Sequence, residues 1–204
     1  MKKLVLTTLI ALCLAVSTQA RDVAANKITT KENLAFVKGE NKLFTGNAFF
    51  FFDNGKTKKI VPYYQGELDG RLTEWRSNGT VKTIAYFRKG KQDGEYIGRY
   101  SNGKKSVVAY YRDGKQDGEV TTWYTNAKRK SQSFFRNNTQ DGEAITWYEN
   151  GKKASQGLYT NGRKTGTHKM WHDNGVLGYK AIFSDGSLMG KAQEWNAKGK
   201  NITK

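Results

Sequence analysis

Seven glycines recur at intervals of 24 residues, and this repeat limits what the chain can fold into more than any other feature. The glycine column consists of Gly46, Gly70, Gly94, Gly118, Gly142, Gly166 and Gly190. Three further columns share the period: an Asn-Gly pair that starts at Asn54-Gly55, an aromatic column that starts at Tyr63, and a tryptophan-rich column that starts at Phe51. Four columns with one period and no insertion predict identical structural units stacked along one axis.

The Asn-Gly column predicts a tight hairpin in every unit. An Asn-Gly pair between aromatic-rich runs is typical of a two-residue type I′ turn, in which both residues need a positive φ. With Asn102-Gly103 as the turn, Glu95 to Tyr100 and Lys105 to Tyr111 become paired strands. Counting outward from the turn places Gly94 opposite Tyr111, so we expect an aromatic ring to lie across each glycine of the column.

The segments between these hairpins also repeat, as in Arg88–Gly94 and Arg112–Gly118. Their glycines can reverse the chain and start the next strand antiparallel to the last, which gives roughly thirteen strands. A hairpin of this size cannot bury its own faces, so neighbouring hairpins have to stack. The predicted fold class is all-β: an elongated, single-layer antiparallel meander of tandem 24-residue β-hairpin repeats.

The first twenty residues have the features of a secretory signal peptide. Lys2 and Lys3 form a positive start, Leu4 to Val16 is an apolar run of thirteen residues, and Thr18-Gln19-Ala20 offers small residues for cleavage. The run is too short for a membrane span, which needs about twenty residues. We therefore expect export to the periplasm, the cell surface or the medium, with no transmembrane segment after cleavage.

Cleavage after Ala20 also changes the chemistry of the chain. The formal charge falls from +17 to +15, and the single cysteine, Cys13, is removed. A mature chain without cysteine has no disulfide and no thiolate chemistry. The predicted organisation is a signal peptide at 1–20, a flexible lead-in at 21–33, and a repeat domain at 34–204 with about six full units and partial units at its ends.

The repeats resemble the MORN repeat in its bacterial second variant, over about residues 34–199. The likeness rests on Trp147-Tyr148-Glu149-Asn150-Gly151-Lys152, on Tyr110–Gly118, and on the opening segment Phe36–Gly46. The resemblance implies the hairpin-array fold. Bacterial proteins of this type are often catalogued as antitoxins of toxin–antitoxin systems, so the resemblance also implies that role, although classical antitoxins act in the cytoplasm. Choline-binding repeats are the nearest alternative family, but their usual paired tryptophans before a glycine turn are absent here.

The residue pattern argues against catalysis and against a bound metal or other cofactor. His168 and His172 fall in a predicted strand, where residues four apart lie about 13 Å from each other, too far to share one ion. Carboxylates flank a glycine in Asp93-Gly94-Glu95 and in later units. Because a catalytic pair is needed once and not in every unit, and because Asp before Gly is ordinary turn chemistry, we interpret these acids as structural.

The candidate binding residues are aromatic and basic. They are Trp123, Trp147, Trp171, Lys128, Arg129, Lys130, Lys152 and Lys153. Basic residues gather near both ends of the predicted strands, where they form either a solvated charged rim or a ridge for an anionic partner. Alternation along the strands places Tyr96 and Tyr111 on one face and Trp123 and Phe134 on the other, so some aromatic surface should remain accessible.

These observations predict a non-catalytic, exported binding or scaffolding module for a macromolecular partner, either a protein or an anionic component of the cell envelope. Nucleic acid suits aromatic and basic side chains chemically, but it is a poor match for an exported protein. The alternative function is an antitoxin or immunity-like protein that neutralises one toxin. Such a protein should bind through its irregular units, where Arg99 replaces tryptophan and Ala127 replaces glycine.

Overall fold

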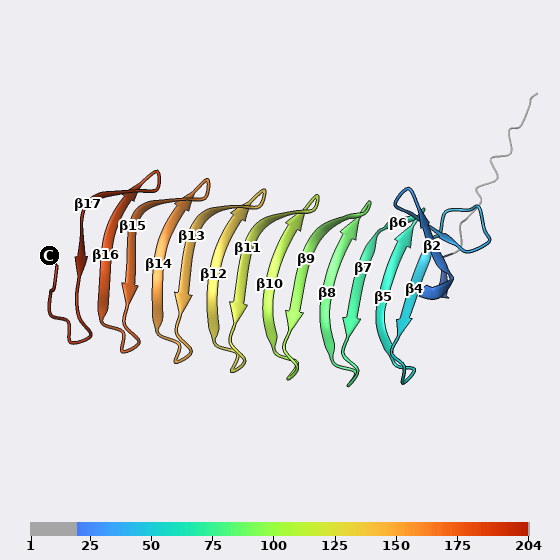
Figure 1. Cartoon of the computed structure of the whole chain (residues 1–204), viewed down its shortest axis with the longest axis horizontal. Coiled ribbons are helices and arrows are strands. Elements are labelled where there is room, and N and C mark those ends of the chain that lie inside the picture. Colours follow the sequence, from blue (N-terminus) through green and yellow to red (C-terminus); the bar gives the residue numbers. More distant parts are fainter. Residues whose placement is uncertain (1–19, 204) are drawn as a thin grey trace, which may run out of the picture.

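The computed structural model describes residues 20–203 and shows a long row of antiparallel strands (Figure 1). The predicted signal peptide lies outside the described residues except for Ala20. One sheet of 15 strands carries almost the whole fold, and a 2-stranded sheet lies at its N-terminal end. Within residues 20–203, no helix is long and apolar enough to cross a membrane.

The large sheet follows the order of the sequence. Its strands are β1 (Arg21–Ala24), β4 (Gly46–Phe51), β5 (Thr57–Tyr64), β6 (Glu67–Leu68), β7 (Gly70–Trp75), β8 (Val81–Arg88), β9 (Lys91–Arg99), β10 (Lys105–Arg112), β11 (Lys115–Trp123), β12 (Arg129–Arg136), β13 (Thr139–Trp147), β14 (Lys153–Thr160), β15 (Arg163–Trp171), β16 (Leu177–Ser184) and β17 (Ser187–Glu194). From β4 to β17 each strand on the main path pairs antiparallel with the next one. The predicted fold class, a single-layer meander of tandem hairpins, is confirmed.

The type I′ turns lie in the segments between the predicted hairpins and not at the Asn-Gly pairs. Lys89 and Gly90 have φ values of 48° and 75°, and the flanking residues Arg88 and Lys91 pair directly. Positive φ at both central residues matches the right-handed twist of the strands. Each of these strands therefore begins earlier than the sequence predicts, at Lys91 in place of Glu95.

The Asn-Gly pairs belong to a longer loop, so the prediction of a type I′ turn at Asn102-Gly103 is wrong. The Gly103 N–H donates to Tyr100 O at 3.0 Å, the Tyr100 N–H donates to Lys104 O at 2.9 Å, and only Gly103 of the pair has a positive φ, at 81°. A β-turn followed by a left-handed glycine is the usual three-residue hairpin loop. The register shifts by one residue beyond Lys105, and this bulge restores the predicted pairing of Gly94 with Tyr111.

The glycine column is explained by a second bulge rather than by the paired ring. Gly94 has φ +115° at the point where the register between β8 and β9 shifts. A Cβ placed there would lie 3.1 Å from Cβ of Tyr86 on the preceding strand. The atoms nearest to that Cβ belong to Tyr86 and not to Tyr111. The column is glycine because the left-handed backbone disfavours a side chain.

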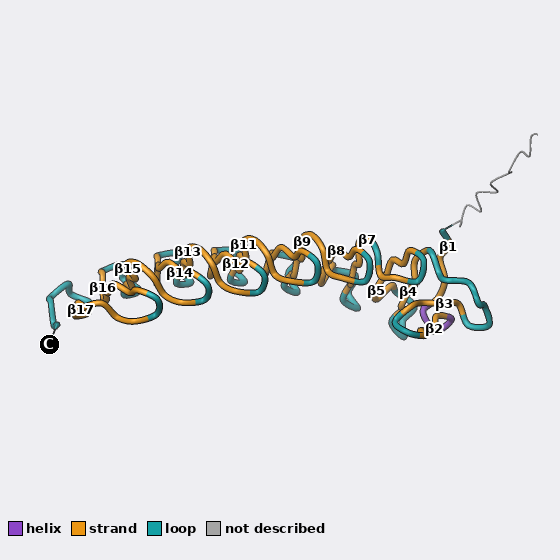
Figure 2. The backbone as a smooth tube through the Cα atoms, turned by 90° about the horizontal axis from the view of Figure 1, so that it is seen from above, coloured by secondary structure: helices purple, strands orange, loops and turns teal. Residues whose placement is uncertain are grey.

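The N-terminal end is ordered, in contrast to the predicted flexible lead-in at 21–33. β1 pairs in parallel with β4, and a short 3-10 helix (Ala25–Lys27) leads into a hairpin of β2 (Ile28–Lys31) and β3 (Leu34–Val37). This hairpin lies against one face of the sheet (Figure 2). Ala35 and Val37 of β3 pack with Phe44, Ala48 and Val61 in a buried cluster. The hairpin thus covers the first unit, whose apolar face has no preceding unit beside it.

Side chains join one unit to the next at the Asn-Gly end of the strands. The hydroxyl of Tyr100 donates to Trp123 O at 2.6 Å, and Tyr124 and Tyr148 make the same bond with the following unit. Asn102 accepts from the Lys104 N–H in its own turn and donates its amide to Thr125 O. The asparagine of the Asn-Gly column therefore links neighbouring units. This role explains why asparagine is kept at Asn126 in the unit where Ala127 stands in place of the glycine.

Candidate binding surfaces

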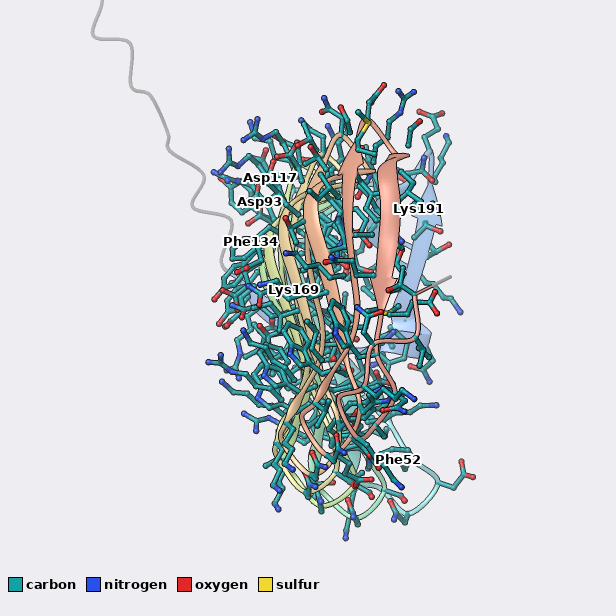
Figure 3. The ribbon with its side chains drawn as sticks, turned by 90° about the vertical axis from the view of Figure 1, so that its left-hand side faces the viewer. Phe52, Asp93, Asp117, Phe134, Lys169 and Lys191 are labelled. Atoms are coloured by element: carbon teal, nitrogen blue, oxygen red, sulfur yellow. The ribbon has the colours of Figure 1, made fainter. Side chains whose placement is uncertain are left out.

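The array has two rims and two faces. We call the edge formed by the Asn-Gly loops, such as residues 100–104, the Asn-Gly rim, and the edge formed by the type I′ turns, such as residues 89–90, the connector rim. Figure 1 shows the connector rim above and the Asn-Gly rim below. In Figure 3, Asp93 and Asp117 lie toward the connector rim and Phe52 lies at the opposite rim.

Acidic side chains neutralise three arginines of the connector rim. Arg88 pairs with Asp93 at 2.6 Å, Arg163 pairs with Asp185 at 2.7 Å, and a looser pair joins Arg112 to Asp117. The hydrogen bond from Arg88 holds the pKa of Asp93 below its ordinary value. Three arginines of this rim are therefore paired with acid of the same or the neighbouring unit, whereas Lys89, Lys91 and Lys115 form no ion pair among residues 20–203.

The aspartates before the column glycines have a structural role in this geometry. Asp69 accepts the backbone N–H of Lys89 at 3.1 Å, and Asp141 accepts that of Asn161 at 3.2 Å. Each carboxylate thereby fixes the type I′ turn of the following unit. This recurring contact agrees with the interpretation of the Asp-Gly-Glu segments as turn chemistry.

The five predicted basic residues lie together on the Asn-Gly rim, on β12, β14 and the loops before them. Lys128 and Lys152 donate to the backbone oxygens of Asn150 and Asn174, at 2.8 and 2.7 Å. These two lysines therefore also connect units, which the sequence did not indicate.

The other three basic residues make no contact with acid. Lys130 lies over the ring of Tyr124, and Lys153 lies over the ring of Trp171, each with Nζ 5.7 Å from the ring centroid. Arg129 is an exposed residue at the start of β12. Within residues 20–203, no ion pair involves Arg129, Lys130 or Lys153, and the same holds for Lys128 and Lys152. The Asn-Gly rim thus keeps unneutralised positive charge in successive units.

The predicted tryptophans end the strands on this rim. Trp123, Trp147 and Trp171 are the last residues of β11, β13 and β15, and each is half-buried. Their backbone oxygens accept the tyrosine bonds from the preceding units. The structure therefore brings the tryptophans and the basic residues to one rim, where the tryptophans also support the array.

One face carries an exposed apolar row, as expected for a single-layer sheet. Tyr86, Tyr110 and Phe134 recur every 24 residues and are 38%, 43% and 36% exposed. Phe134 points away from the sheet in Figure 3. Glu95 and Glu119 pair with Tyr110 and Phe134 in the register, so carboxylates alternate with the rings. The prediction of accessible aromatic surface is confirmed.

The opposite face contains a shallow hollow of about 280 Å³ over β12 to β16, which the sequence analysis missed. Its lining includes Ser131, Ala144 and Ser155. Both serines occupy the position that Val107 holds in an earlier unit, and Ala144 occupies the position of Tyr96. The signal that could have revealed it is this run of small residues where other units carry large ones.

The two histidines are held by backbone oxygens. His168 is buried in β15, with Nε2 2.9 Å from Leu158 O and its ring between Tyr159 and Phe183. His172 follows β15 and places Nε2 2.8 Å from Trp195 O, which is the contact that tyrosine makes in earlier units. Each imidazole thus acts as part of the packing between strands.

The family comparison matches residues 140–161 to a MORN repeat variant. This segment is similar to a MORN repeat. It begins in β13, passes through the loop at Asn150-Gly151 and reaches the type I′ turn after β14, so the MORN unit coincides with one hairpin of the array. The predicted resemblance is confirmed for this unit. The comparison with curated proteins finds no match for the chain.

The MORN assignment bears on function at a general level. A β-hairpin repeat of this kind is consistent with a binding or scaffolding module, and MORN repeat proteins are generally non-catalytic. The geometry adds three surfaces that a partner could contact: the positively charged Asn-Gly rim, the exposed apolar row on one face, and the hollow on the other face.

Proposed function

We propose that this protein is an exported, non-catalytic binding module that holds an anionic macromolecular partner against its Asn-Gly rim. The partner is either an anionic component of the cell envelope or an acidic protein. The observation that carries the proposal is the difference between the rims. Aspartates neutralise three arginines along the connector rim, whereas five basic residues of the Asn-Gly rim have no acidic partner among residues 20–203: Lys128, Arg129, Lys130, Lys152 and Lys153. Lys82, the equivalent of Lys130 two units earlier, does pair with Glu74, at 3.1 Å.

The repeat supports an extended partner. Equivalent residues of successive units are two strands apart, which is about 9.6 Å at the usual spacing of a sheet. Arg129 and Lys153 occupy equivalent positions, so their charges recur along the rim at this interval. Several weak, exposed charges acting together attract a polyanion, and this attraction is strongly screened by salt.

The test compares two triple variants with the same change in charge. Replacing Arg129, Lys130 and Lys153 by serine removes rim charge that makes no ion pair or backbone bond. Replacing Lys89, Lys91 and Lys115 by serine removes an equal charge from the connector rim. Binding to phosphatidylglycerol vesicles and to an acidic polypeptide, poly-glutamate, is measured between about 0.05 and 0.5 M NaCl, roughly the range over which screening becomes complete.

We expect the Asn-Gly-rim variant to bind at least about tenfold more weakly at low salt, and the connector-rim variant to bind nearly as well as the natural chain. Circular dichroism and thermal unfolding confirm that both variants keep the array. Equal losses in both variants would show that net charge alone drives binding, and this result would contradict the proposal.

Export is tested separately by N-terminal sequencing of the protein from cell fractions. We expect mature protein that begins at Arg21 in an envelope or extracellular fraction. An intact Met1 in the cytoplasm would refute export.

The alternative function, neutralisation of one toxin, predicts that binding depends on the irregular units. Arg99 donates to Gly103 O within its own loop, and Arg76 donates to Arg99 O, so both guanidinium groups have structural contacts. Protection against a co-expressed toxin that is lost in Arg99→Trp would support the alternative. Loss in the rim variant with retention in Arg99→Trp would favour the rim.

A further inference from the structure

The hollow on the face opposite the exposed aromatic row has a polar floor. Thr146 and Ser155 face each other across β13 and β14, with their hydroxyl oxygens 2.6 Å apart, and Thr122 and Ser131 form the same pair on β11 and β12. One hydroxyl of each pair donates to the other. The second O–H and the remaining lone pairs stay available to a ligand.

Aromatic side chains border this floor. Tyr159 and Tyr179 line the hollow together with His168, whose ring makes an edge contact with Tyr159 at 5.3 Å between centroids. The floor is low because Ala144 and Gly157 occupy it, whereas the equivalent residues Tyr96 and Ala109 fill the same face two units earlier. The hollow is therefore a local departure from the repeat and not a feature of every unit.

Charge in the hollow has one sign. Its lining includes Lys164 and Lys169 and contains no aspartate or glutamate. Lys164 lies on β15 with Nζ 5.0 Å from the centroid of the Phe183 ring, at the end of the hollow nearest the connector rim. A ligand with an occasional negative group would therefore meet a complementary charge there.

We propose that this hollow binds an acidic oligosaccharide, a chain of sugars that carry carboxylates. Sugar hydroxyls match the paired serine and threonine hydroxyls, the apolar faces of sugar rings suit Tyr159 and Tyr179, and a sugar carboxylate suits Lys164. A peptide fits less well, because the backbone groups under the hollow are already paired within the sheet and offer no free edge for strand addition. From β12 to β16 the hollow extends about 19 Å, which accommodates a short chain of sugars.

The proposal is tested by calorimetric titration with hexagalacturonate, an acidic hexasaccharide, and with maltohexaose, a neutral one. Two variants fill the hollow with residues that the array already uses at equivalent positions: Ala144→Val, as at Val120, and Ser155→Val, as at Val107. Ala192→Val is the matched control, because Ala192 is equivalent to Ala144 but lies on β17, outside the hollow.

We expect hexagalacturonate to bind the natural chain and the Ala192→Val control equally, and to bind each filled variant at least tenfold more weakly. Lys164→Gln should weaken binding several-fold. At about 0.5 M NaCl, where the attraction of the exposed rim is screened, the triple variant of Arg129, Lys130 and Lys153 should bind this sugar normally, so failure of the hollow and failure of the rim are distinguished.

Three results would overturn the inference. The first is that hexagalacturonate does not bind the natural chain. The second is that both filled variants bind it undiminished while circular dichroism shows that they remain folded. The third is that maltohexaose binds as tightly as hexagalacturonate, which would remove the role of the carboxylate. Capture of an extended peptide that competes with the sugar at equal affinity would also contradict it.

Discussion

The imidazole ring of His168 occupies the space in which a side chain at Gly157 would stand. A Cβ built on Gly157 would lie 2.1 Å from Nδ1 of His168, although the backbone of Gly157 is in an ordinary region. Earlier units have a small residue with a side chain here, such as Ala109, opposite Val120 in place of histidine. The two residues are therefore matched to each other, and the match sets the shape of the hollow beside them.

Replacing Gly157 by alanine should destabilise the array by about 1–3 kcal/mol, because the added methyl group overpacks the site. The same substitution should cost much less in a chain that also carries His168→Val, since valine is the residue that faces alanine two units earlier. Urea unfolding of the four members of this double-mutant cycle measures the coupling. Additive effects would show that the ring and the glycine do not share this space.

The tyrosine bonds between units should contribute measurably to stability. Tyr148→Phe removes the hydroxyl that donates to Trp171 O at 2.7 Å, and we expect a loss of about 1 kcal/mol in the free energy of unfolding. Tyr64→Phe serves as the control, because Tyr64 is 54% exposed. If chemical denaturation finds equal effects for the two variants, the bond between units contributes nothing to stability.

Ala127 is held in the left-handed region, with φ 71°, at the position where other units carry glycine. Ala127→Gly should therefore stabilise the chain by about 1 kcal/mol through relief of this backbone strain. Gly103→Ala is the reverse change at an equivalent site, where φ is +81° and no atom lies within 4 Å of the added Cβ. Thermal unfolding should move in opposite directions for the two variants, and a shift of the same sign would contradict this account.

The connector rim should show a defined dependence on pH. The hydrogen bond from Arg88 lowers the pKa of Asp93 below its ordinary value of 3.8. A lowered pKa in the folded state means that the contribution to stability is present at neutral pH and disappears as the pH falls through the folded pKa. Carboxyl titration by NMR should give a pKa for Asp93 that rises in Arg88→Gln. An unchanged pKa would show that the pair is not formed in solution.

Much of the candidate rim could be predicted from the sequence, because a strict period fixes which residues are equivalent. Lys130 and Lys153 were expected near the ends of the strands, and both lie there, over the rings of Tyr124 and Trp171. The bonds from Lys128 and Lys152 to the next unit could not be predicted, because they depend on how far one loop stands from its neighbour. The hollow was missed for a related reason: it exists only where residues from several strands are small at the same place on one face.

The sequence by itself determined the repeat, the strand pairing and the single-layer sheet. Gly94 pairs with Tyr111 as counted from Asn102-Gly103, although the loop there is longer than predicted and a bulge makes up the difference. Only the tertiary structure decided which turn is type I′, that Tyr86 covers Gly94, and that the residues from Arg21 to Val37 form strands over the first unit. The physical reason is that a period specifies which residues are equivalent, whereas turn geometry, bulges and the covering of an exposed end depend on contacts between strands in three dimensions.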